Sequence, residues 1–86
     1  MEHSEITRRF ASNLRLAMEE LGYSQKKLAK KAGCYQSFVS DVVNGKRIVR
    51  IHTADRFAKA VGVETWQIFL PKQQFLKVVR KENESE

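Results

Sequence analysis

The side chains best suited to recognise a ligand are hydrogen-bonding groups and cations gathered between residues 35 and 50. A polar stretch, Tyr-Gln-Ser, occupies residues 35–37, and a basic stretch, KRIVR, occupies residues 46–50. A glutamine amide can pair with adenine N6 and N7 at once, and a serine hydroxyl can bond a base or a phosphate. Lysine and arginine neutralise phosphates. The combination indicates recognition by hydrogen bonds and charge, with no bond-making chemistry.

Side chains with other chemical potential are scattered along the chain. The two histidines, His3 and His52, are far apart, and no His, Cys or carboxylate group has metal-ligand spacing. The single cysteine, Cys34, has no internal disulfide partner, and such a residue is more often a buried spacer than a reactive thiol. The glycines form no phosphate-binding loop, and no nucleophile stands with a base. We therefore expect no enzyme activity, no metal and no cofactor.

The composition bounds the class of protein. A chain of 86 residues has room for one hydrophobic core. Its 16 basic and 10 acidic side chains give a net charge of +6, which favours a polyanionic partner, although a solvated basic surface explains charge alone equally well. No apolar run approaches the roughly 18 residues that span a bilayer. The N-terminus lacks a signal peptide's apolar core, so we expect a cytoplasmic protein with no membrane partner.

Hydrophobic periodicity predicts five helices and no convincing strand. The helices are expected from about Ser4 to Leu21, over residues 25–32, from Tyr35 or Gln36 to Val43, from about Ile51 to Val61, and from a cap at Glu64 or Thr65 to Leu70. Serines precede the first two as N-caps, and glycines or a proline follow several of them as stops. Their apolar stripes are expected inside, and the members that matter below are Ile6, Phe10 and Leu14 in the first, Phe38, Val39 and Val42 in the third, and Ile51, Ala54 and Phe57 in the fourth.

The second and third helices form the most specific pattern. They are short and meet at Gly33, where the turn favours positive φ. A small residue, Ala29, sits where the helices must approach closely, and Val39 and Val42 pack the third helix onto the second. This is the arrangement of a helix-turn-helix unit, whose second helix enters a DNA major groove.

Three segments carry a family resemblance: LGYSQKKLAKKAG, SFVSDVVNGKR and ADRFAKAVGV. In order and spacing they resemble the lambda repressor and Cro-like, or XRE-like, family over about residues 8–70. The resemblance implies an all-α, five-helix domain over residues 4–70, with its helix-turn-helix unit at about 24–44 and a C-terminal extension at 71–86. It also implies a cytoplasmic regulator that binds double-stranded DNA, usually as a homodimer on a palindromic operator. We see no separate ligand-sensing domain in the sequence and therefore expect no small-molecule ligand.

The resemblance and the side-chain chemistry together assign roles. The base-reading positions are Gln36, Ser37, Ser40 and Asp41. The DNA-backbone positions are Gln25, Lys26, Tyr35, Asn44, Lys46, Arg47 and Arg50. For Tyr35 the alternative is packing beneath the helix. For Asp41, which phosphates repel, pairing with Lys46 or Arg47 is preferred to a contact with cytosine.

The C-terminal extension holds a second apolar patch. It can fold back onto its own domain or pair across a dimer, as a helix or as a strand. The expected dimer interface comprises Trp66, Phe69, Phe75, Leu76, Val78 and Val79, and the acidic end KENESE is expected to fray. The function we expect is a sequence-specific repressor. The alternative is an antitoxin or protein-interaction module that holds a protein partner with this patch.

Overall fold

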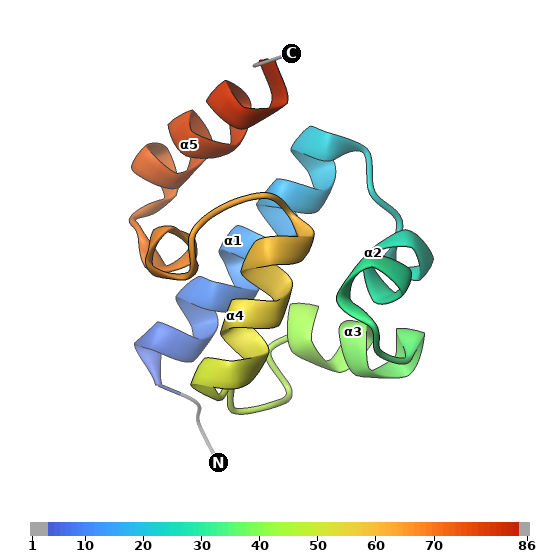
Figure 1. The fold of residues 1–86 in the computed structure, drawn as a ribbon. Coiled ribbons are helices and arrows are strands. Elements are labelled where there is room, and N and C mark those ends of the chain that lie inside the picture. Colours follow the sequence, from blue (N-terminus) through green and yellow to red (C-terminus); the bar gives the residue numbers. More distant parts are fainter. Residues whose placement is uncertain (1–3, 85–86) are drawn as a thin grey trace.

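The computed structural model describes residues 4–84, with side chains as far as residue 81. Over these residues the chain forms five α-helices, one 3-10 helix and no strand, so the predicted all-α fold is confirmed (Figure 1). The elements are α1 (Glu5–Leu21), α2 (Gln25–Ala32), α3 (Gln36–Val43), α4 (Ile51–Ala60), the 3-10 helix η1 (Thr65–Phe69) and α5 (Lys72–Glu84).

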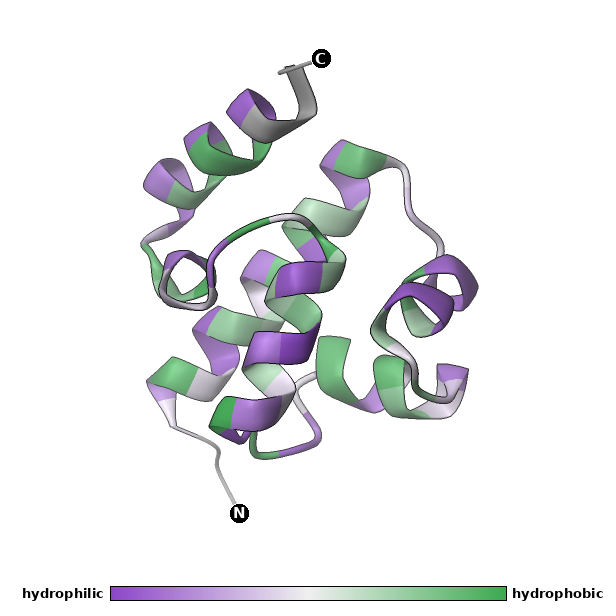
Figure 2. Cartoon of the chain, viewed as in Figure 1, coloured by the Kyte–Doolittle hydropathy of each residue, from purple (hydrophilic) through white to green (hydrophobic). Residues whose placement is uncertain are grey.

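The long helix α1 is the centre of the fold. It begins where Ser4 Oγ accepts a hydrogen bond from the Thr7 amide, at 3.2 Å, and it ends at Gly22. In Figure 1, α2 and α3 lie on one side of α1, and α5 lies on the other. The core between these elements includes Phe10, Leu14, Leu28, Val39, Phe57, Ile68 and Phe75, all fully buried. Hydrophilic and hydrophobic residues alternate along α1, α4 and α5 in Figure 2, as they do in amphipathic helices that share one core.

Two isoleucines that were expected inside lie outside. Ile6 is 55% exposed, and Thr7 takes the inner position. At 3.6 residues per turn, Thr7 lies about 20° around the helix from Leu14, whereas Ile6 lies about 80° away. Ile51 is 85% exposed because it is the first residue of α4, one turn before burial begins at Ala54.

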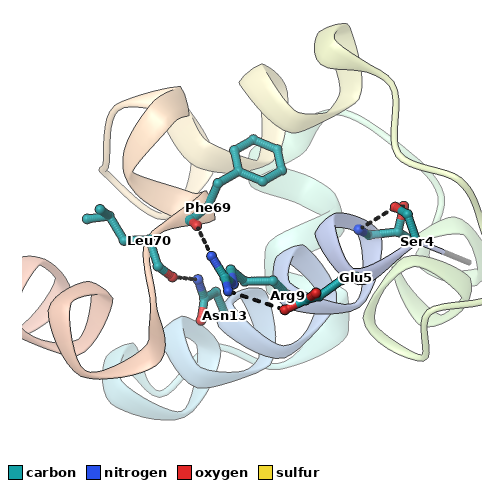
Figure 3. Close-up of polar contacts among 7 residues, drawn as sticks. Ser4, Glu5, Arg9, Asn13, Phe69 and Leu70 are labelled. Carbon is teal, nitrogen blue, oxygen red and sulfur yellow. Dashed lines mark hydrogen bonds and ion pairs between the residues drawn. The ribbon is translucent and has the colours of Figure 1, made fainter.

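The short helix η1 is fixed to α1 by polar contacts to its carboxyl end. Asn13, itself buried, donates from Nδ2 to the carbonyl oxygens of Ile68 and Leu70, both at 2.8 Å. Arg9 Nη1 donates to the Phe69 carbonyl at 3.3 Å (Figure 3). Carbonyls at the end of a helix have no partner within it, so these side chains satisfy them. The sequence placed a helix here but did not identify it as 3-10.

The C-terminal extension is a helix that folds back onto its own domain. Phe75 and Val79 are buried in the same core as α1, so the prediction that these two residues form a dimer interface is wrong. Arg80 reinforces the packing, because its Nε and Nη2 donate to the two carboxylate oxygens of Glu20 at 3.2 and 3.3 Å. The end that was expected to fray is helical as far as Glu84; residues 85 and 86 lie outside the described part.

Candidate nucleic-acid interface

The corner between α2 and α3 is built by local signals. Ser24 Oγ accepts from the Lys27 amide at 3.0 Å and starts α2. Gly33 ends it at φ 71°, a left-handed conformation that disfavours any side chain, and the Cys34 amide then donates to the Ala29 carbonyl at 3.0 Å. Ala29 is buried, as close helix approach requires. The predicted helix-turn-helix geometry is present.

Helix α3 is held to the domain along one face. Val39, Val42 and Val43 are buried. Phe38 is half-buried and stacks on Phe57 of α4, with ring centroids 6.1 Å apart and planes 15° apart. These contacts leave the opposite face of the helix for solvent or a ligand.

Two arginines that sequence reasoning did not single out help to fix this unit. Arg15 of α1 donates from Nη1 to the Val43 carbonyl at 2.9 Å, at the end of α3. Arg56 of α4 reaches the Gly33 carbonyl at the turn, at 3.5 Å, and its Nη2 lies 3.4 Å from His52 Nε2. Both arginines stand outside the apolar stripes of their helices, which is the only sequence signal for them.

The outward face of α3 carries the residues predicted to read bases. Gln36 and Ser37 are exposed, and Ser40 and Asp41 are half-exposed. Tyr35, immediately before the helix, is 83% exposed, so the alternative that it packs beneath the helix is excluded. Its side chain makes no capping hydrogen bond, which leaves the phenol available to a ligand.

The loop after α3 places cations beside that face. Lys46, Arg47 and Arg50 are all exposed. Arg47 turns back to α3, where its Nε lies 3.3 Å from Asp41 Oδ2, so the ion pair preferred for Asp41 is confirmed. The Arg47 guanidinium also lies over the Phe38 ring, 4.9 Å from its centroid.

The other predicted backbone residues come from α2 and the end of α3. Gln25 and Asn44 line one shallow hollow, together with Arg15 and Tyr23. Lys26 is exposed beside them. Two of the other lysines of α2 are partly fixed, because Lys27 and Lys31 hold their ammonium groups 4.8 and 5.4 Å from the centre of the Tyr23 ring. The structure therefore places Gln25, Asn44 and Arg47 against α3, while Lys26 and Arg50 are exposed.

Cys34 sits half-buried in the turn, where burial raises the pKa of its thiol and nearby Arg56 opposes that change to a smaller degree. A raised pKa keeps the thiol protonated at neutral pH, which fits a spacer. Among the described side chains, no three or more His, Cys, Asp or Glu residues gather as a metal site would require; His3 lies outside them. Within residues 4–84, no helix has both the length and the apolar character to cross a bilayer.

The remaining predicted dimer residues lie away from this surface. Trp66 of η1 is 64% exposed. Phe69 and Val78 are half-buried against the core, and Leu76 is half-buried. They belong to η1 and α5, on the side of α1 opposite to α2 and α3 (Figure 1). Among the described residues, α5 exposes mainly polar and basic side chains, and Trp66 of η1 is a large apolar side chain exposed on this side.

Comparison with known proteins agrees with this geometry. A helix-turn-helix family matches residues 14–65. A "Neisseria hypothetical transcription factor" from Neisseria meningitidis serogroup B is 33% identical over 69 residues, which are 80% of this chain and 65% of that protein, so the chain spans slightly less than two thirds of this relative. The crystal structure of the hypothetical transcription factor NHTF from Neisseria superposes with a TM-score of 0.76 at 30% identity, covering 91% of this chain and 93% of that one. The chain belongs to the helix-turn-helix family of the lambda repressor, or XRE, type.

Proposed function

We propose that this protein is a sequence-specific transcriptional regulator that binds double-stranded DNA through α3. The observation that carries the proposal is the two-sided character of that helix. Valines hold one face to the core, while Gln36 and Ser37 stand exposed, and Arg47 of the basic loop contacts Asp41 and Phe38 of the same helix. The family and both relatives support a transcription factor and do not point to an enzyme.

The side chains divide into two groups by chemistry. Gln36, Ser37 and Ser40 can form hydrogen bonds with base edges, and a glutamine that pairs with adenine favours that base. Gln25, Lys26, Tyr35, Asn44, Lys46 and Arg50 can contact phosphates and sugars, which gives affinity without sequence information.

The test measures duplex binding as salt rises. A protein that neutralises several phosphates loses affinity steeply between about 50 and 200 mM salt. Lys46→Ala should weaken binding to every duplex alike, and Gln36→Ala should reduce the preference between duplexes. The matched control is Lys77→Ala, an exposed lysine of α5 on the far side of α1, which should change neither. Absence of binding at low salt to both random and genomic duplexes would refute the proposal.

The oligomeric state we propose is a homodimer on a palindromic operator. Two copies of α3 would then enter successive major grooves, about 34 Å apart. The exposed Trp66 is the candidate contact, since tryptophan is enriched at the buried centres of protein interfaces. Trp66→Ser should lower the molar mass in solution and weaken operator binding. If the wild type and Trp66→Ser have the same molar mass, whether that of a monomer or that of a dimer, Trp66 is not part of the interface.

The sign of regulation we propose is repression, in a cytoplasmic setting. A small domain bound across a promoter excludes polymerase without further contacts. The antitoxin or interaction-module alternative loses its main support, because Phe75 and Val79, which were to hold a protein partner, fill the domain's own core. A promoter reporter carrying a selected binding site should fall in output when the protein is produced. A rise in output would show activation.

A further inference from the structure

We propose that Arg47 reads a guanine in the major groove and that Asp41 is the positioning residue that holds it there. The inference rests on the proposed DNA-binding function and makes it more specific. It replaces the sequence-based assignments of Arg47 to a phosphate and of Asp41 to a base.

The Arg47 guanidinium is held by Asp41 and by the ring of Phe38. Asp41 accepts from Arg47 Nε at 3.3 Å, and the Phe38 ring lies beneath the guanidinium at 4.9 Å. Phe38 is in turn stacked on Phe57, a fully buried residue of α4. The arginine therefore stands on an aromatic support that continues into the core, and its plane is restricted by two contacts of different kinds.

The two terminal nitrogens of Arg47 remain available for a ligand. Asp41 uses Nε, and within the described residues Nη1 and Nη2 of Arg47 make no hydrogen bond. These two nitrogens form a fork whose geometry matches O6 and N7 of guanine. The Arg47 side chain is 53% exposed, so the fork is accessible to a partner.

The position of Asp41 on α3 determines where the fork of Arg47 lies. Asp41 follows Ser37 by four residues, so the two share one face of α3. An arginine anchored at Asp41 is therefore placed beside the row that contains Ser37, on the face that would meet base edges. Arg47 itself comes from the loop, six residues after Asp41, so no helical periodicity places it there.

The charge of the Asp41–Arg47 ion pair favours a base over a phosphate as the ligand. A carboxylate 3.3 Å from the guanidinium offsets its positive charge and adds a repulsion toward phosphates. A neutral pair gains little from a phosphate, yet it keeps two donors for the acceptors of guanine. Lys46 and Arg50 are exposed beside it and can supply the charge. The ion pair thus lowers the affinity for all duplexes, and in return it gives a preference at one base pair.

The experiment selects duplexes from a random library with the full chain and then measures affinities on the selected duplex. We expect one guanine per half-site that the wild type prefers by about tenfold over other bases. Replacing it with 7-deazaguanine, which lacks the N7 acceptor, should cost the wild type a similar factor. Arg47→Lys keeps the charge without the fork, and it should reduce the preference at this position to less than about twofold.

Asp41→Asn tests the positioning role. The preference for that guanine should fall by about threefold, as for the loss of one exposed ion pair. Affinity for unrelated duplexes should rise at the same time, because a negative charge has been removed. Lys46→Ala is the comparison: it should weaken all duplexes equally and leave the guanine preference intact. Both Asp41 and Arg47 are partly or fully exposed, and circular dichroism checks that the variants fold.

Three results would overturn the inference. One is a guanine preference that survives Arg47→Lys, and another is a preference unchanged by Asp41→Asn. The third is loss of a cytosine preference in Asp41→Asn, which would mean that Asp41 reads a base directly. In each of these the selected duplex still binds and the proposed function stands. If no duplex binds and no sequence is enriched, the proposed function fails together with the inference.

Discussion

Asn13 offers a sharp test of how the C-terminal half is attached to α1. Its side chain is 1% exposed, and Nδ2 donates two hydrogen bonds of 2.8 Å to the end of η1. Asn13→Ala removes both donors and leaves two carbonyl oxygens unpaired. Two lost bonds at about 1 kcal/mol each, with about 1 kcal/mol for the unpaired groups, give a loss near 3 kcal/mol. For a domain of this size, that lowers Tm by about 12–24 °C.

The assay is thermal unfolding followed by circular dichroism at fixed protein concentration. The matched control is Asn44→Ala, since Asn44 is exposed and its only described side-chain bond is a 3.5 Å contact to Ser40. That control should cost less than about 0.5 kcal/mol. A loss for Asn13→Ala within 1 kcal/mol of the control would refute the reasoning, because it would show that water or relaxation satisfies the two carbonyls.

A second substitution at the same site tests the electrostatics. In Asn13→Asp the new carboxyl would face two carbonyl oxygens in a buried site, which disfavours its ionised form and raises its folded-state pKa above the unfolded value of about 3.9. A group of this kind contributes stability below its unfolded pKa and loses it as pH rises through its folded pKa. We therefore expect this variant to be closer to wild-type stability at pH 4 than at pH 7. An equal deficit at both values would contradict that expectation.

Three further predictions follow from burial, backbone conformation and titration. Phe75→Ala should cost about 3–5 kcal/mol in urea unfolding, whereas Gln74→Ala, exposed on the same helix, should be nearly neutral; a small loss for Phe75→Ala would mean that α5 does not belong to the core. Gly33→Ala should cost about 1–2 kcal/mol of stability, because alanine would have to adopt the positive φ of this turn. Open space surrounds the position, so no steric clash adds to this cost. The absence of a loss would show that the turn can adopt another conformation. Hydrogen bonds from Thr65 and Lys59 lower the pKa of Asp55. The stability that Asp55 contributes is therefore present above its unfolded pKa and is lost as pH falls through its folded pKa. Asp55→Asn should flatten the change in Tm between pH 5 and about pH 3, and an unchanged slope would contradict this.

The attachment of the tail shows where sequence reasoning stops. The pattern in residues 75–79 established that an apolar face exists, and it left open whether the face packs on its own domain or on another chain. The answer depends on whether α1 offers a free surface next to η1. That surface exists, and the contact between Arg80 and Glu20, 60 positions apart in the chain, closes over it. Periodicity carries no information about contacts at such separations.

Burial near the ends of helices was also decided by packing. Ile6 and Ile51 have the residue type of a core position, yet Ile6 lies about 80° around α1 from Leu14, with Thr7 buried in its place, and Ile51 is the first residue of α4. The neighbouring elements cover the middle of these helices, where Leu14 and Phe57 are fully buried. Residue type predicts a preference for burial, but the direction of the side chain on its helix and the reach of the neighbouring elements determine whether it is satisfied.

The sequence by itself determined the first four α-helices and their approximate limits, the turn at Gly33 and the two-sided character of α3, whereas it left α5 open as a helix or a strand. These depend on capping serines, on a glycine that accepts positive φ and on a 3.6-residue period, which all act over a few neighbouring residues. Only the tertiary structure decided which polar side chains meet. Arg15 reaches Val43 across 28 positions, and the Arg47 guanidinium comes to rest between Asp41 and the ring of Phe38. Such contacts depend on how packed helices and a loop without periodicity are oriented in space, and that orientation is set by the whole core.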